Sequence, residues 1–178
     1  MIQLIRIQDK QFKPFITEQK IADAVKGLAC AINEELKDEF PVFLAVLNGS
    51  FMFASDLLKE IDIPCEISFV KMASYEGTTN TGRISELIGL TEDLTNRTVV
   101  IVEDIVDSGN TLERLTYALK ERNVKQIKVA TVLFKPDAYK KELQVDYVGF
   151  SIGNDFVVGY GLDYNGQGRN LKGIHVIA

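Results

Sequence analysis

The stretch that most constrains the fold is an apolar run, Val99 to Val102, followed at once by Glu103 and Asp104. A strand that is apolar at successive positions is covered on both faces, as in the middle of a parallel sheet. Ligands of such sheets bind beyond the carboxyl ends of the strands. Acidic side chains there are costly to bury unless they face a cleft and are used. We therefore expect an α/β fold with a functional site after this strand.

A third acidic residue and a hydroxyl-rich turn follow the strand and lead into a helical pattern: Asp107, Ser108, Gly109, Asn110 and Thr111. Backbone N–H groups, hydroxyls and a positive helix end suit a phosphate monoester. The alternative interpretation is that Asn110 only caps the helix, with Glu113 completing a capping box. The turn alone favours the alternative, whereas the carboxylates before it favour a phosphate site.

A second strand-turn-helix unit has the same form. Val42–Leu47 is predicted to be a buried strand, followed by Asn48, Gly49 and Ser50 and by a helix over about Phe51–Ile61. Parallel neighbouring strands bring both turns to one edge of the sheet. Two facing anion turns suit a substrate that is phosphorylated at both ends, although Asn48–Ser50 taken alone favours an ordinary turn.

The remaining patterns complete one domain. After an extended start, Thr17 is predicted to cap a long helix whose apolar stripe contains Ile21, Ala24, Val25, Leu28, Ala29, Ile32 and Leu36. Leu112, Leu115 and Leu119 should face inward on the helix after the central turn, which should end near Asn123. Further strands are predicted at Cys65–Tyr75, Gln126–Phe134, Gln144–Ile152 and Phe156–Val158. A long Gly- and Thr-rich connection, about 74–97 with a short alternating piece near Ile84–Leu90, is predicted to be a flexible lid, and a surface loop without a function is the alternative.

Composition excludes several classes of protein. The chain has 178 residues and a net charge of −5, which argues against a nucleic-acid binder held by a general basic field. No apolar stretch resembles a signal peptide or reaches the roughly 20 residues of a membrane span, so no membrane association is expected. Cys30 and Cys65 are predicted to be buried, reduced thiols of a cytoplasmic protein. His175 is the only histidine, which leaves little for a Ser-His-Asp triad or a His-rich zinc site.

The central signature resembles the phosphoribosyl-diphosphate motif of type I phosphoribosyltransferases. Over nearly the whole chain the sequence is similar to the hypoxanthine-guanine type, through Leu47 to Ser50, Ser74-Tyr75, Lys135, Asp155 to Tyr160, Leu162 to Asn165 and Arg169. The resemblance implies a mostly parallel central sheet flanked by helices in a single domain, 1–178. It places the core at about 17–150 and a small hood at about 1–16 and 151–178.

The resemblance also implies a reaction: transfer of 5-phosphoribose from phosphoribosyl diphosphate to N9 of hypoxanthine or guanine, giving IMP or GMP and pyrophosphate. Its site residues fall into six groups. They are catalytic Asp107; ribose- and phosphate-binding Glu103, Asp104, Ser108, Gly109, Asn110 and Thr111; pyrophosphate-binding Asn48, Gly49 and Arg169; purine-binding Lys135, Phe156, Val157 and Asp163; lid residues Ser74 and Tyr75; and Mg²⁺-binding Asp163, Glu103 and Asp104.

Three further points concern these site residues. Phe156 and Val157 can equally be strand core, and for Val158 the core interpretation is preferred. Many relatives place Lys or Arg where this chain has Asn48, so a cationic contact to pyrophosphate is missing. The resemblance also suggests a cis peptide between Leu47 and Asn48.

Other functions on the same fold remain open at this stage. One is a xanthine-preferring enzyme, because the contacts to the purine 2-position are expected from backbone groups. Another is a regulator that senses nucleotides or binds RNA, which ranks lower because the chain is acidic and keeps Lys135, Phe156 and Asp163. Relatives also suggest a homodimer or homotetramer.

Overall fold

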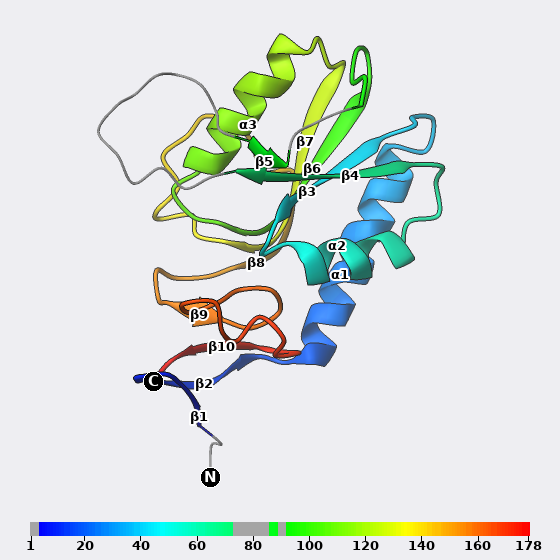
Figure 1. Ribbon diagram of the computed structural model, residues 1–178. Helices are drawn as coiled ribbons and strands as arrows, with labels where there is room; N and C mark the ends of the chain where they lie inside the picture. The colour runs from blue at the N-terminus through cyan, green and yellow to red at the C-terminus, as the bar shows by residue number, and fades with distance from the viewer. Residues whose placement is uncertain (1–3, 73–85, 89–91) are drawn as a thin grey trace, which may run out of the picture.

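The computed structural model describes residues 4–72, 86–88 and 92–178 and contains two β-sheets (Figure 1). The larger sheet has the strand order β5-β4-β3-β6-β7-β8, and all its pairs are parallel except β4 with β5. Its strands are β3 Val42–Leu47, β4 Glu66–Met72, β5 Glu86–Ile88, β6 Thr98–Val106, β7 Gln126–Phe134 and β8 Tyr147–Ser151. This confirms the predicted α/β class with a mostly parallel sheet.

Helices cover both faces of the larger sheet, which is why its central strands are apolar at successive positions (Figure 1). On β6, Val100 and Val102 pack on the side of α1 (Glu18–Glu35) and α2 (Phe51–Lys59). Val99 and Ile101 of the same strand pack on the side of α3 (Asn110–Glu121). Because successive side chains point to opposite faces, this strand contributes to two separate apolar layers.

The helices form where apolar spacing and end signals agree. Thr17 caps α1 as predicted, its hydroxyl accepting from the Lys20 N–H at 3.3 Å. Nearly all of the predicted stripe of α1 is buried, and Leu112, Leu115 and Leu119 of α3 are buried too. No helix in the described part of the chain is long and apolar enough to cross a bilayer.

The smaller sheet joins the two ends of the described chain. Its order is β1-β2-β10-β9, and every pair is antiparallel. The strands are β1 Ile5–Ile7, β2 Lys10–Ile16, β9 Val157–Val158 and β10 Ile174–Ile177. Figure 1 shows this sheet below the larger one, with α1 rising directly from the end of β2. The loop between β9 and β10 is thereby held near the carboxyl ends of the parallel strands.

Two predictions on this scaffold are wrong. Cys30 is exposed rather than buried, because it lies beside the apolar stripe of α1 and faces solvent. The second helix ends at Lys59 instead of Ile61. The reason is a side chain of α1: Asn33 donates to the Glu60 carbonyl and accepts from the Asp62 N–H, both at 3.0 Å, which satisfies the backbone at this helix end.

Gly27→Ala should raise the free energy of unfolding by about 0.5–1 kcal/mol. Gly27 lies inside α1 on its exposed side, and a Cβ there would meet nothing within 4 Å. Alanine therefore reduces the entropy lost on folding without a clash. Urea denaturation at neutral pH measures the change, and a lower midpoint than that of the wild type would contradict it.

Candidate active site

The two predicted anion turns meet at one edge of the larger sheet. The turn after β3 and the start of α3 after β6 share a pocket of about 240 Å³. Its lining consists of Val46, Leu47, Gly49, Met72, Glu103, Asp104, Thr111 and Arg114. The parallel pairing of β3 with β6 produces this convergence, as the sequence predicts.

Glycine lets the first turn lie directly on the acidic pair. A Cβ added to Gly49 would overlap the carboxylate of Asp104. Only glycine permits this approach between a backbone and a neighbouring side chain. The Leu47–Asn48 peptide just before it is cis, as the family resemblance suggests.

Glu103 and Asp104 lie inside β6 rather than after it, because the strand continues to Val106. Glu103 is only 6% exposed. Burial, and then the neighbouring Asp104 carboxylate, hold the pKa of Glu103 well above its usual value. Burial also raises the pKa of Asp104, which the Ile105 N–H and the charge of Arg169 partly oppose.

No lysine or arginine of the described residues forms a salt bridge with either of these two carboxyl groups. Two buried acids without a cationic partner are an energetic cost to the free protein. A bound group that donates hydrogen bonds or carries positive charge would lower this cost.

The second turn leads into a helix that has no side-chain cap. Gly109 has φ +81° and occupies the N-cap position of α3, and no side chain bonds the first-turn N–H groups. The alternative in which Asn110 caps the helix with Glu113 is therefore wrong. The helix starts one residue earlier than that interpretation requires, and Glu113 pairs with Lys141 at 2.8 Å instead.

The start of α2 has the same property. Ser50 is its N-cap residue, but its hydroxyl donates to the Val46 carbonyl at 2.7 Å and caps nothing. The helix away from this edge, α1, has its threonine cap. Both helices that begin at the pocket edge thus keep first-turn N–H groups available for an anion.

Lys135 follows β7 and lies beside Asp107 on the same edge. Its Nζ is 3.3 Å from an Asp107 carboxylate oxygen, and it also donates to the Asn154 carbonyl at 3.5 Å. The lysine side chain is 9% exposed, whereas that of Asp107 is 53% exposed. The structure therefore brings together the predicted catalytic carboxylate and the predicted purine-binding lysine.

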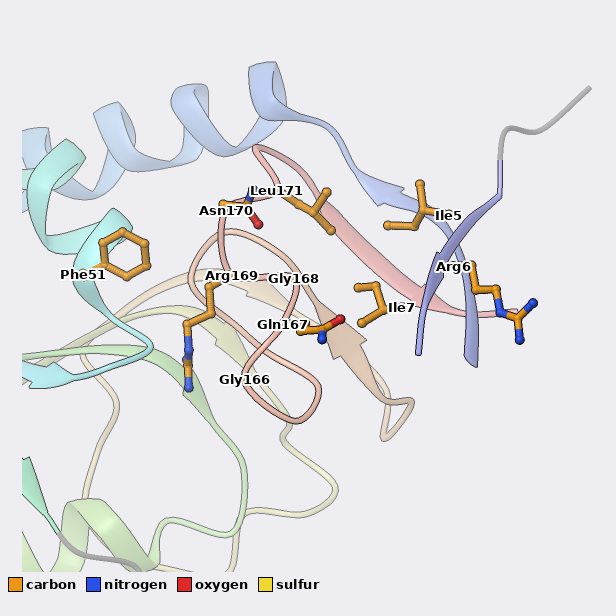
Figure 2. Close-up of a pocket in the computed structure, with 10 residues that line it drawn as sticks. All are labelled: Ile5, Arg6, Ile7, Phe51, Gly166, Gln167, Gly168, Arg169, Asn170 and Leu171. Carbon is orange, nitrogen blue, oxygen red and sulfur yellow. The ribbon is translucent and has the colours of Figure 1, made fainter. Parts of the chain in front are cut away.

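The loop after β9 presents Asp163 and Arg169. Arg169 Nη2 lies 2.6 Å from Asp163 Oδ1, and its Nη1 donates to the Gly161 carbonyl at 2.6 Å. The second Asp163 oxygen accepts from the Gly166 N–H at 2.6 Å. This loop also lines a second pocket, of about 620 Å³, in which Figure 2 shows Phe51 of α2 across from Ile5 and Ile7 of β1.

Phe156 has the exposure that a base-stacking ring needs. It is 44% exposed, and its ring centroid lies 6.3 Å from that of Phe12 and 5.8 Å from that of Tyr164. The two valines that follow it, Val157 and Val158, are both buried. The Val157 side chain packs in the core between the larger sheet and α1, whereas that of Val158 packs with Ile7 and Phe12. Val157 can therefore meet a ligand only through its backbone.

Some predicted residues are not brought together. In the described ranges, no group of three or more His, Cys, Asp or Glu side chains is arranged to hold a metal ion. Asp163 is engaged by Arg169, so it does not join Glu103 and Asp104 in one ligand group. Ser74 and Tyr75, the predicted lid residues, lie outside the described residues. Arg114 in the pocket wall was not predicted, although it lies one helical turn after the phosphate turn.

Comparison with known proteins decides the family. A family model described as phosphoribosyl transferase domain matches residues 15–165. The hypoxanthine-guanine phosphoribosyltransferase of Bacillus subtilis (strain 168) is 39% identical over 166 residues, which cover 93% of this chain and 92% of the relative. The chain belongs to the hypoxanthine-guanine phosphoribosyltransferase family. It is therefore a transferase, as the sequence predicts.

Solved structures of hypoxanthine-guanine phosphoribosyltransferases share its fold. One from Bacillus anthracis str. 'Ames Ancestor' is 35% identical, with a TM-score of 0.86 over 100% of this chain and 99% of that chain. A hypoxanthine phosphoribosyltransferase from Staphylococcus aureus is 37% identical, with a TM-score of 0.87 over 93% of this chain and 90% of that chain. These matches confirm the predicted type I phosphoribosyltransferase fold.

Glu103→Gln should stabilise the free protein at about pH 8. The folded state raises the pKa of Glu103 above the value of about 4.3 expected in an unfolded chain. The folded protein then holds this proton more tightly than the unfolded chain does, and stability is lost as the pH rises through the folded-state pKa. Glutamine removes the buried charge and keeps the volume.

The gain should be absent below about pH 4, where both states of Glu103 are protonated, and should grow as the pH rises. Urea denaturation of both proteins across this range measures it. A variant that is less stable than the wild type at about pH 8 would contradict the burial cost assigned to Glu103.

Proposed function

We propose that this protein transfers 5-phosphoribose from phosphoribosyl diphosphate to N9 of hypoxanthine or guanine, giving IMP or GMP and pyrophosphate in purine salvage. The observation that supports this most is the pair of uncapped helix starts on either side of Glu103 and Asp104. Two anion cradles with carboxylates between them match a sugar that carries a phosphate at one end and a diphosphate at the other.

The ribose and its 5′-phosphate would occupy the β6 side of the pocket. Glu103 and Asp104 would accept hydrogen bonds from the 2′- and 3′-hydroxyls, while Ser108, Gly109, Asn110 and Thr111 hold the 5′-phosphate. Carbon 1 of the ribose gains positive charge as its bond to pyrophosphate weakens. The nearby carboxylates would stabilise that charge electrostatically.

The purine would lie between Phe156 and the Asp107–Lys135 pair. Lys135 would donate to the 6-oxo group, which favours hypoxanthine or guanine over adenine because the adenine 6-amino group is itself a donor. Asp107 would take or hold the N7 proton while N9 attacks carbon 1. In the free protein these two side chains neutralise each other, so the base would replace one partner of an existing ion pair.

Arg169 supplies the positive charge of the pyrophosphate end, where Asn48 brings none. Its guanidinium is already held in place by Asp163 and the Gly161 carbonyl. Backbone N–H groups of Asn48 and Gly49 at the start of α2 would complete this subsite. Asp163 would contribute to the purine end and, through a metal ion, to the diphosphate.

Mg²⁺ fits the donor set around the acidic pair. Two buried carboxyl groups with raised pKa values, which form no salt bridge with the described lysines and arginines, favour binding of positive charge. Mg²⁺ typically takes only one or two carboxylates and completes its shell with substrate oxygens and water. Bound beside Glu103 and Asp104, it would neutralise the diphosphate and reduce its repulsion from these acids.

The remaining assignments concern the surroundings of the site. Residues of about 74–97, with Ser74 and Tyr75, would close over the substrate and exclude water. A core at about 17–150 and a hood from about 1–16 and 151–178 would enclose the purine. We further propose a homodimer or homotetramer in the cytoplasm.

A steady-state panel of four bases tests the proposed function. With phosphoribosyl diphosphate and Mg²⁺, hypoxanthine and guanine should react well, xanthine less well and adenine not measurably. EDTA in excess should abolish product formation, and added Mg²⁺ should restore it. Preference for xanthine or adenine would contradict the substrate assignment, and full activity in EDTA would contradict the metal assignment.

Asp107→Asn should lower kcat by roughly 10²- to 10⁴-fold, because the amide cannot take the N7 proton. The fold should be retained, since the ion pair that it removes is half-exposed and contributes little to stability. Asp137→Asn is the matched control, because it makes the same change at an exposed position just after Lys135. Near-normal turnover of Asp107→Asn in a stopped-time assay would remove the catalytic role.

A further inference from the structure

Tyr160 is a buried side chain of the β9–β10 loop that the proposed reaction does not use. It is 4% exposed, and its hydroxyl donates to Asp56 Oδ2 of α2 at 2.9 Å. The other Asp56 oxygen accepts from Lys59 at 2.9 Å. Burial, followed by the hydrogen bond to Asp56, raises the pKa of Tyr160, so the phenol stays neutral and remains a donor.

The residue after Tyr160 touches the pyrophosphate turn directly. Gly161 has φ +100°, and a Cβ on it would overlap the carbonyl oxygen of Gly49. The Gly161 carbonyl in turn accepts from Arg169 Nη1 at 2.6 Å. Since Gly49 lies on Asp104, one stack of close contacts joins the arginine loop, the turn after β3 and the acidic pair.

The β9–β10 loop has two contacts that hold it against the turn after β3 and α2. The contact between Gly161 and Gly49 is steric and does not by itself fix the direction of the loop. Asp56 lies more than one turn along α2 from that contact, so its hydrogen bond to Tyr160 attaches the loop to α2 at a second, separate point. Tyr160 itself has φ +51°, a conformation that a bulky side chain keeps only where its surroundings hold it.

We propose that Tyr160 and Asp56 are positioning residues for the pyrophosphate subsite. Together they hold the loop that carries Arg169 in register with the Asn48–Ser50 turn, so that the guanidinium and the turn N–H groups face the same diphosphate. This inference rests on the proposed function and adds two residues to it.

Tyr160 and Asp56 act from outside the substrate pocket. Both line a separate groove of about 220 Å³ between α1 and α2, together with Met52, Lys59 and Lys172. None of the residues that line this groove also lines the pocket around Glu103 and Asp104. The tyrosine hydroxyl therefore influences the diphosphate only through the position of the loop.

The structure offers a matched control for a purely structural role. Tyr147 is 5% exposed, and its hydroxyl donates to the Glu35 carboxylate at 2.6 Å. Like Tyr160, it joins a β-region to a helix through a phenol-to-carboxylate hydrogen bond. Its partner lies on α1, away from the arginine loop, so Tyr147→Phe removes a comparable bond without touching the proposed subsite.

The test compares Tyr160→Phe with Tyr147→Phe in the full chain. Tyr160→Phe should raise KM for phosphoribosyl diphosphate, and for pyrophosphate in the reverse reaction, by about 3- to 10-fold, which is the scale of the net contribution of one hydrogen bond. KM for hypoxanthine and for IMP should change by less than about twofold, which is less than the contribution of one hydrogen bond. Tyr147→Phe should lower Tm by a similar amount and leave all four KM values unchanged.

Substitutions of Asp56 test the same bond from the other side. Asp56→Asn keeps an acceptor for the phenol and should stay close to the wild type, whereas Asp56→Leu should reproduce the KM pattern of Tyr160→Phe. The double variant Tyr160→Phe/Asp56→Leu should be no worse than the more affected single variant, because both changes remove one interaction.

These measurements distinguish a failure of this inference from a failure of the proposed function. An active wild type in which Tyr160→Phe or Asp56→Leu changes all KM values equally, or no more than Tyr147→Phe does, overturns this inference and leaves the proposed function standing. A wild type that makes no nucleotide from any of the four bases overturns both.

Discussion

Two carboxyl groups buried at the end of β6 are the constraint on which the rest of this site depends. Glu103 and Asp104 sit in the central strand, where both faces of the sheet are already covered by apolar layers. Their burial raises both pKa values, so the free protein carries a desolvation cost at neutral pH. In the reaction that we propose, the ribose hydroxyls and a cation would remove this cost, so the same burial that destabilises the empty pocket would favour binding of a sugar diphosphate.

The neighbouring backbone is arranged around that pair. Gly49 and Gly161 lack the Cβ atoms that would otherwise separate the turn after β3 from Asp104 and from the arginine loop. Three segments far apart in sequence can therefore converge on a volume that suits a small anion. Around them, α2 and α3 begin without side-chain caps, and in the proposed function the phosphate groups of the substrate would bind the free N–H groups at these helix ends. The uncapped helix starts would therefore both strengthen ligand binding and destabilise the empty site.

The sequence was most informative where a single periodicity decides the structure. The strands at Val42–Leu47 and Gln126–Phe134 and the cap at Thr17 are confirmed, because burial on two faces and capping both leave local patterns. The extent of β6 was missed because acidic residues interrupt its apolar run. The cap at Asn110 was wrong because Gly109, with positive φ, occupies the N-cap position instead. The Tyr139 ring lies where a Cβ on residue 109 would be, a tertiary contact that leaves no local pattern. The bond between Tyr160 and Asp56 spans 104 residues and has no local signature.

The antiparallel pairing of β2 with β10 sets an order of events during synthesis. All strands of the larger sheet precede β10 along the chain, so they leave the ribosome before it does. The smaller sheet must wait until residues 174–177 have left the ribosome, because β10 is the strand that bridges β2 and β9. Phe156, just before β9, gains its aromatic support only then. The strand that carries Glu103 and Asp104 therefore emerges from the ribosome before the sheet beside Phe156 can be completed.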